Sequence, residues 1–114
     1  MPRDSKVYLE DILASALKIR EYVGTMARDE FARDGKTVDA VVRNLEIIGE
    51  AVKRLPESVR AEGRDIEWQK IAGLRDVLIH AYSRVDIDII WDVVTNKLPE
   101  FAAKVRALSD RSLE

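Results

Sequence analysis

Apolar residues in the first third of the chain recur at spacings of three and four, the repeat of an α-helix that is buried along one side. This pattern predicts a helix over residues 5–32. Its buried stripe would consist of Tyr8, Ile12, Ala16, Ile19, Val23 and Met26. The helix is expected to end near residues 34–35, because Gly35 is suited to a left-handed C-terminal cap.

The same repeat continues along the chain and predicts further helices. Thr37 is expected to cap a helix that runs to Leu55 and stops before Pro56. A short helical turn and a loop would follow. A third long helix is expected to begin at Ile66 or Glu67.

Two residues in the C-terminal third of the sequence indicate where further helices begin. Asp86 is a good N-cap for a fourth helix, and Pro99 is suited to the opening of the last one. The predicted architecture is therefore an all-α bundle of four to five antiparallel helices with short connections. All residues, 1–114, are expected to form a single domain.

The segment "GLRDVLIHAYSRVD" (residues 73–86) contains the single histidine of the chain, His80. With 100° per residue, the apolar positions near it form one stripe roughly 120° wide. This stripe consists of Ile71, Leu74, Val77, Leu78 and Ala81. Arg75 and Tyr82 fall beside the stripe. Asp76 and His80 fall on the far side, four residues apart, so the carboxylate could orient the imidazole and favour its charged form.

Arg75 and His80 diverge by about 140° around the helix axis, so a single helix cannot easily direct both side chains at one atom. Ile79 would lie on the outer face between them, where an isolated bundle has no use for an apolar side chain. A second copy of the chain that covered this face would bring both residues of both copies to one groove. The geometry therefore predicts a homodimer through the motif-bearing helices.

Composition limits the classes of partner. Charged residues make up 35% and apolar residues 46% of the chain, as in folded globular proteins. The net charge of −2 argues against RNA binding by bulk positive charge. Four basic residues could form a local RNA track, although a solvated charged face explains them equally well: Arg43, Lys53, Arg54 and Arg84.

The missing residue types exclude other chemistry. No cysteine is present, which excludes disulfides, thiolate zinc sites and cysteine nucleophiles. His80 has no second histidine with which to share a metal ion, so no metal site is expected. The polar start "MPRDSKVYLED" shows neither a signal peptide nor a transmembrane span, and a cytoplasmic protein without membrane contact is expected.

"RDVLIHAY" fits the Arg-x4-His-x-Tyr signature of HEPN-domain proteins, and specifically resembles the HepT-like toxins of prokaryotic toxin–antitoxin pairs. "VRNLEIIGEAVKRLP" and "WQKIAGLRDVLIHAYSRVDIDIIWDVVTNKLPEF" are similar to the same family. The resemblance covers residues 38–101. One difference is "YSRVD", where relatives often carry an aromatic residue or a glycine after the tyrosine.

The resemblance implies a metal-independent endoribonuclease that works as a homodimer and needs no cofactor. Arg75 would hold the scissile phosphate and stabilise its growing charge. His80 would act as general base toward the ribose 2′-hydroxyl or as general acid toward the leaving 5′-oxygen, with Asp76 holding the imidazole. The expected products carry 2′,3′-cyclic phosphate and 5′-hydroxyl ends.

The resemblance also implies a protein partner, a minimal nucleotidyltransferase that serves as the antitoxin. In this family the antitoxin transfers AMP to the tyrosine of the motif, which is Tyr82 here. Anionic groups added beside Arg75 would occupy the phosphate site and repel RNA, which would silence the toxin.

Each of these residues also has an ordinary structural explanation. His80 could be an interface histidine without a catalytic role, and Arg75 could form a weak surface ion pair. Tyr82 could bury its ring and expose its hydroxyl group, while Asp76 could be a solvated acid. Trp68 and Trp91 are expected in the core rather than as stacking platforms for bases, and Glu50 is assigned only a supporting role.

A second hypothesis belongs to the binding class. The domain would then be a catalytically idle docking or nucleotide-binding partner of a nucleotidyltransferase. Arg75 and Tyr82 would bind the nucleotide or the partner protein, and substitution of His80 would change assembly without changing RNA cleavage.

Overall fold

The computed structural model describes the backbone of residues 3–80 and 86–111, with their side chains apart from those of residues 3, 75–77, 79 and 80. This part of the chain forms α-helices and one π-helical turn, and contains no strand. In chain order the elements are α1 (Arg3–Val23), α2 (Arg28–Arg33), α3 (Gly35–Arg54), α4 (Glu57–Glu62), α5 (Trp68–His80), α6 (Ile87–Asp92), the π-helical turn η1 (Val93–Lys97) and α7 (Leu98–Arg111). The all-α prediction is confirmed.

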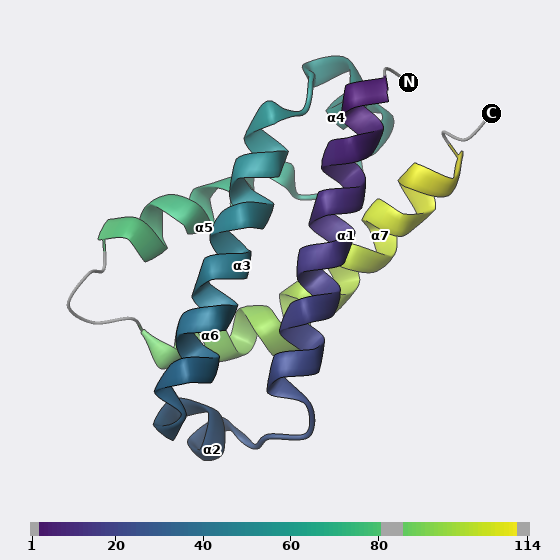
Figure 1. Cartoon of the computed structure of the whole chain (residues 1–114). Helices are drawn as coiled ribbons and strands as arrows, with labels where there is room; N and C mark the ends of the chain where they lie inside the picture. Colours follow the sequence, from purple (N-terminus) through teal and green to yellow (C-terminus); the bar gives the residue numbers. More distant parts are fainter. Residues whose placement is uncertain (1–2, 81–85, 112–114) are drawn as a thin grey trace.

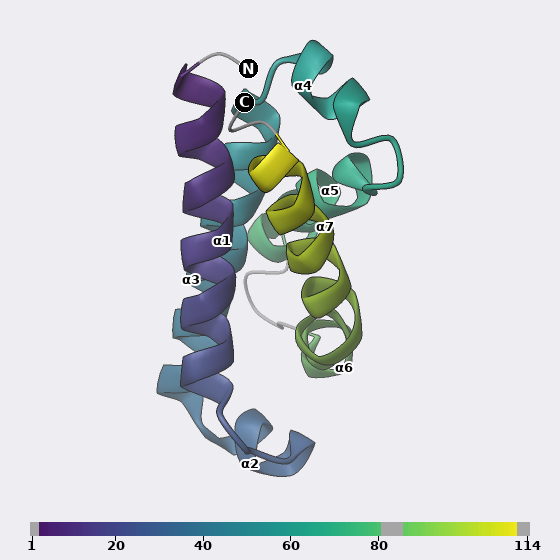
Figure 2. The same cartoon turned by 90° about the vertical axis from the view of Figure 1, so that its right-hand side faces the viewer.

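The helices form two layers. Helices α1 and α3 lie antiparallel and side by side in one layer (Figure 1). Helix α5 and the run from α6 to α7 make up the other layer (Figure 2). Helix α3 packs against both α1 and α5, and α1 also packs against α7. The helix that carries the motif is thus held by the central helix of the bundle.

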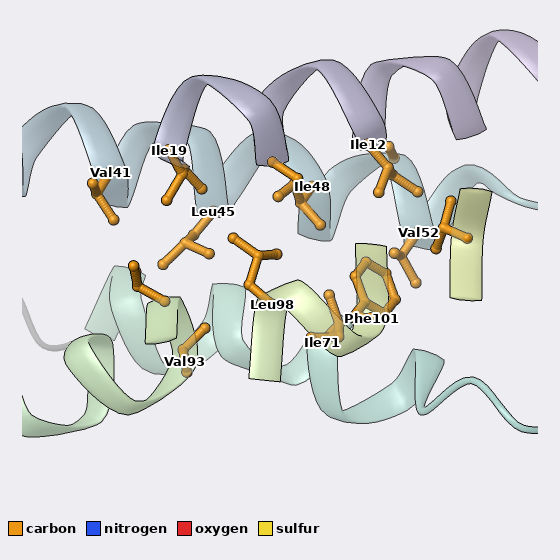
Figure 3. Close-up of a cluster of buried hydrophobic side chains, with 14 of the residues drawn as sticks. Ile12, Ile19, Val41, Leu45, Ile48, Val52, Ile71, Val93, Leu98 and Phe101 are labelled. Carbon is orange, nitrogen blue, oxygen red and sulfur yellow. The ribbon is translucent and has the colours of Figure 1, made fainter. Parts of the chain in front are cut away.

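The core lies between the two layers. Buried side chains from α1, α3, α5 and the C-terminal helices point toward one another there (Figure 3). The residues that the figure labels are Ile12, Ile19, Val41, Leu45, Ile48, Val52, Ile71, Val93, Leu98 and Phe101, and all are buried. Ile12, Ile19 and Ile71 belong to the stripes that the helical repeat predicts to face inward, so the periodicity identified these buried faces correctly.

The first helix is shorter than predicted. Helix α1 ends at Val23, and the chain then turns before the separate helix α2 begins at Arg28. Gly24 causes this break, because its φ of 53° lies in the left-handed region that glycine adopts without strain. Its N–H still donates to the carbonyl of Arg20 at 2.9 Å, as in a helix C-terminal cap.

The boundary between α2 and α3 also differs from the prediction. Gly35 is not a left-handed cap, because it is the first residue of α3 and its φ is not positive. The N-cap is Asp34 rather than Thr37. The carboxylate of Asp34 accepts from the backbone N–H of Thr37 at 3.1 Å. Aspartate is among the strongest N-caps, which explains why it displaces the threonine three residues later.

The two glycines provide a matched test of this part of the fold. Gly24→Ala should lower the free energy of unfolding by about 1 kcal/mol, since alanine is strained in the left-handed region. Nothing lies within 4 Å of a methyl group placed on Gly35. Gly35→Ala should therefore be neutral or slightly stabilising. Urea denaturation of both variants measures the difference, and equal effects would contradict this account of the break.

The C-terminal helices form one continuous run. Asp86 caps α6 as predicted, and its carboxylate accepts from the N–H groups of Asp88 and Ile89. Pro99, expected to open a separate helix, is instead the second residue of α7, which follows η1 without a break. Proline has no N–H to donate four residues back, and its ring crowds that carbonyl. The wider π-helical turn before it is a usual way to accommodate such a defect.

Candidate functional site

Helix α5 is fixed at its N-terminus by Trp68. The indole Nε1 donates to the carbonyl oxygens of Arg60 and Gly63, each at 3.1 Å. The ring also meets Phe101 of α7 edge to face, with centroids 5.8 Å apart. Trp68 is therefore a core residue, as the sequence predicts, and its hydrogen bonds and packing set the position at which α5 begins.

Gly63 allows the approach of α5 to the preceding loop. A Cβ at this position would lie 2.8 Å from the side chain of Ile66 and 3.3 Å from the ring of Trp68. Real Cβ contacts are longer than the first of these distances. Glycine in this loop, which the sequence indicates, thus favours close packing against Ile66 and Trp68, and its backbone is not left-handed.

The motif residues Arg75, Asp76 and His80 lie in the second half of α5. Ile71 and Leu78 are buried and Leu74 is partly buried, which confirms the predicted apolar stripe as far as the side chains are described. The backbone is helical from Trp68 to His80, so Arg75, Asp76 and His80 belong to one helix as predicted. Positions 76 and 80 are consequently one turn apart.

The close approach of the motif side chains to one another remains a prediction. The side chains of Arg75, Asp76, Ile79 and His80 lie outside the described part of the structure. Tyr82 lies in residues 81–85, which are also outside it. The structure therefore places three motif residues on one packed helix.

An interaction that the sequence does not reveal fixes α6, the helix that follows the motif. Arg28 of α2 donates through Nε to Asp88 of α6 at 2.7 Å, and Asp88 is the main cause of the raised pKa of Arg28. Phe31 of α2 contacts Trp91 of α6, with ring centroids 5.4 Å apart. Because Phe31 is fully buried, the ring pair forms the apolar part of this α2–α6 clamp.

A groove follows the outer side of α1 and α3 and holds two of the predicted basic residues. It has a volume of about 420 Å³, and its lining includes Arg43, Arg54, Glu46 and Glu50 of α3. Arg54 Nε donates to Glu50 Oε1 at 3.1 Å, and this hydrogen bond is the main cause of the raised pKa of Arg54. The carboxylates offset the arginines, so this groove favours the solvated-face explanation over a basic RNA track.

A second groove lies between α5 and α7, and four of its charged residues form two ion pairs. Its volume is about 250 Å³. Lys70 contacts Glu67 at 2.6 Å, and this pair lowers the pKa of Glu67. Lys104 contacts Glu100 at 3.3 Å. Neither groove presents the concentrated positive charge that non-specific RNA binding requires.

Within residues 3–80 and 86–111, no three histidine, cysteine, aspartate or glutamate side chains gather as metal ligands would. None of the helices described for these residues combines the length and the apolar character needed to cross a bilayer.

Comparison with known proteins gives one family match. Residues 12–108 match the model of the family described as HepT-like, ribonuclease HepT-like. The match contains all of α3 and α5 and most of α1 and α7, so it covers both layers of the fold.

Curated relatives extend this result to individual proteins. The chain is 46% identical over 100 residues to a candidate RNase of Methanocaldococcus jannaschii, covering 87% of this chain and 83% of the relative. It is 40% identical over 108 residues to a candidate ribonuclease HepT of Thermococcus cleftensis, and the alignment covers 95% of this chain and 98% of the relative. A candidate RNase of Caldanaerobacter subterraneus is 41% identical over 101 residues, and the alignment covers 89% of this chain and 90% of the relative. No solved structure matches the chain significantly.

Proposed function

Because this chain belongs to the HepT-like ribonuclease family, we propose that it is a metal-independent endoribonuclease and the toxin of a toxin–antitoxin pair. The observation that carries the proposal is the intact Arg75-x4-His80-x-Tyr82 motif within the matched region, with Arg75 and His80 on α5. The fold supports it by holding α5 at Trp68, Ile71 and Leu78, since a catalytic group acts best from a rigid element.

The proposed active unit is a homodimer in which the motif-bearing helices of two copies line one cleft. Arg75 and His80 diverge on a single helix, so two copies are needed to supply a complete set of groups. The paired charges of the two grooves on the described surface agree with this arrangement. They leave the motif region as the stronger candidate for contact with the scissile phosphate.

In the proposed reaction a neutral His80 removes the proton from the ribose 2′-hydroxyl. The 2′-oxygen then bonds to phosphorus while the bond from phosphorus to the 5′-oxygen breaks. A protonated His80 of the partner subunit gives a proton to the departing 5′-oxygen, so the proton count balances. Arg75 stabilises charge on the non-bridging oxygens, and Asp76 orients the imidazole. No water is consumed, and the products are a 2′,3′-cyclic phosphate and a 5′-hydroxyl.

Control of the enzyme is proposed to act through Tyr82. A nucleotidyltransferase antitoxin would transfer AMP to its hydroxyl, and the added phosphate would compete with RNA for Arg75. Tyr82 is two residues beyond His80 in the sequence, so the added group would be tethered next to the catalytic helix.

The decisive experiment uses the protein expressed without its antitoxin and shown by intact mass to carry no AMP. It should cleave RNA in the presence of EDTA and leave 2′,3′-cyclic phosphate and 5′-hydroxyl ends. RNA that stays intact would contradict the ribonuclease assignment and favour the docking function. Cleavage that disappears with EDTA, or that leaves 5′-phosphate ends, would contradict the proposed chemistry.

A further inference from the structure

Gly73 lies in the interior of α5, where the described part of the fold gives no reason for a glycine. Its backbone is not left-handed, and no described atom lies within 4 Å of a methyl group placed on it. Glycine in the middle of a helix is less stable than alanine, because it loses more conformational freedom on folding. A glycine without a packing or backbone reason is suited to the close approach of a second molecule.

Gly73 is on the same face of α5 as His80. With 100° per residue, the two positions differ by about 20° around the helix axis and are about 10 Å apart along it. Lys70, which is one turn before Gly73 on the helix surface, already lines the groove between α5 and α7. A strand that contacts His80 can therefore pass over the bare surface at Gly73 and reach this groove.

The floor of the groove between α5 and α7 is apolar and belongs to the core. Ile71 of α5 and Phe101 of α7 lie next to each other there (Figure 3). The ring of Phe101 is held by its edge-to-face contact with Trp68. The apolar residues that line the groove are Ile66, Ile71, Leu74, Val93 and Phe101, and all except the partly buried Leu74 are buried. The floor is thus formed in advance of any ligand, as is usual for binding sites.

Three lysines and two glutamates surround this floor. Lys70 pairs with Glu67, and Lys104 pairs with Glu100. Lys97, the fifth charged residue of the rim, forms no ion pair with the described residues. The pKa of Glu67 is lowered by its hydrogen bond to Lys70 and also by the charges of Lys97 and Lys104, so the lysines gather on one rim. An apolar floor beside one excess positive charge complements a ring that is attached to a phosphate.

The size and the wall of the groove also fit a small ring. Its volume of about 250 Å³ is below the range of about 300–1,000 Å³ that is usual for drug-sized ligands. The space therefore suits one ring system rather than a larger molecule. Val93 and Lys97, the first and last residues of the π-helical turn η1, both line it. Turns of this kind are frequent at functional sites.

We propose that the groove between α5 and α7 binds one nucleobase of a single-stranded RNA substrate. The strand passes over Gly73, and Lys97 contacts a phosphate next to the bound base. This subsite deepens the proposed ribonuclease function and rests on it. Leu74 is about 9 Å from His80 along the axis of α5, or about three nucleotides at the 3.4 Å spacing of a stacked strand. The bound base is therefore close to, but distinct from, the nucleotide that reacts.

This mode of binding agrees with the charge of the protein. Single-stranded RNA is commonly held by contacts to the faces of unstacked bases, which make few demands on the base sequence. Such contacts need no large basic surface, so they are compatible with a net charge of −2 and with the paired charges of the grooves.

Removal of single bases from a bound strand tests the subsite. The probe is a short 2′-O-methyl oligonucleotide, which the proposed reaction cannot cleave because the attacking hydroxyl group is blocked. One base is removed at each position in turn, and binding to the wild-type protein is followed by fluorescence anisotropy. Loss of the base that occupies the groove should raise the dissociation constant about tenfold, and loss of the other bases should have smaller effects.

Gly73→Leu places a side chain in the path of the strand. It should weaken binding of the intact oligonucleotide about tenfold, and removal of the sensitive base should then cause no further loss, because both changes remove the same contact. Its melting temperature should not fall, since the position is open and leucine favours a helix. Gly35→Leu is the matched control, because Gly35 is also open and lies beside α2, away from α5 (Figure 1). It should bind like the wild type.

Two further measurements locate the base and the phosphate. 4-Thiouridine at the sensitive position should cross-link under ultraviolet light to peptides that contain Leu74 or Phe101, identified by mass spectrometry. Lys97→Ala should reduce the slope of the logarithm of the binding constant against the logarithm of salt concentration by about 0.7, the contribution of one phosphate of a single strand.

Equal effects of base removal at every position, full binding by Gly73→Leu, or cross-links only outside the groove would each overturn the inference. A Gly73→Leu variant that becomes monomeric in sedimentation velocity while each chain still binds RNA normally would also overturn it. The open face of α5 would then belong to a second copy of the chain.

Cleavage of unmodified RNA by the same proteins separates this inference from the proposed function. Position-dependent base binding by a wild-type protein that leaves RNA intact contradicts the ribonuclease and leaves the subsite standing. Cleavage that Gly73→Leu does not change, together with equal effects of base removal at every position, contradicts the subsite and leaves the ribonuclease standing.

Discussion

His80→Ala should lower the rate of RNA cleavage by about 10²- to 10⁴-fold, the contribution that a positioned acid or base makes to proton transfer. His80 ends the packed part of α5, and it is the only imidazole in the chain. Among the residue types of the motif, histidine alone has an unperturbed pKa near neutral pH. A fluorogenic RNA cleaved under single-turnover conditions gives the rate directly, free of product release.

His80→Gln serves as the companion variant, because it keeps a polar side chain of similar reach but cannot exchange protons near neutral pH. It should be as inactive as the alanine variant. Arg106→Ala, on the exposed side of α7, should cleave like the wild type. Cleavage that continues unchanged in both His80 variants would refute the catalytic role and would point to a contaminating nuclease.

Trp68→Ala should lower the free energy of unfolding by about 4 kcal/mol, the usual range for removing a buried tryptophan. The side chain is 6% exposed and contacts Phe101, and its loss would open a cavity between α5 and α7. It would also leave the carbonyls of Arg60 and Gly63 without their indole donor. Chemical denaturation followed by circular dichroism measures the change.

Trp68→Phe separates the two contributions. Phenylalanine keeps most of the apolar contact but cannot donate, so the expected loss is about 1–2 kcal/mol from the unpaired carbonyl groups. Because Trp68 holds the start of α5, the alanine variant should also bind RNA and partner less well at temperatures where it remains folded. A loss from Trp68→Ala no larger than that from Trp68→Phe would show that the ring contributes little to packing.

The helical repeat predicted the fold class and the buried faces because both follow from local spacing. Ile12, Ile19, Leu45 and Ile48 recur at helical intervals, and all four are in the core. The cap at Asp86 could be predicted equally well, since a carboxylate placed before a helix has a local partner in the backbone. The placement of Arg75, Asp76 and His80 on one helix followed in the same way.

The sequence alone does not predict features that depend on competition between neighbouring residues or on contacts between distant parts of the chain. The periodicity passes through Gly24 without interruption, although its backbone ends α1 there. Asp34 and Thr37 are both suitable caps, and the sequence does not show that the aspartate prevails. The α2–α6 clamp joins Arg28 to Asp88, residues 60 positions apart. Only a correct tertiary arrangement could reveal it.

The same limit applies to the candidate site. Spacing shows that Arg75 and His80 diverge, and it therefore points to a second copy. The roles of Arg75, His80 and Tyr82 come from the family resemblance, because no periodicity distinguishes a catalytic histidine from an interface histidine.

The π-helical turn at Val93–Lys97 makes the packing of α7 depend on the number of residues in this region. The buried residues before Leu98 are Ile90, Val93 and Val94, with an interval of four from Val94 to Leu98, whereas from Leu98 to Leu108 the intervals alternate between three and four. The wider turn absorbs this change of phase. Loss of one residue here would rotate α7 by about 100° relative to α6 and turn Phe101 away from Trp68. Insertions and deletions should therefore be rarer here than in the loop between α1 and α2.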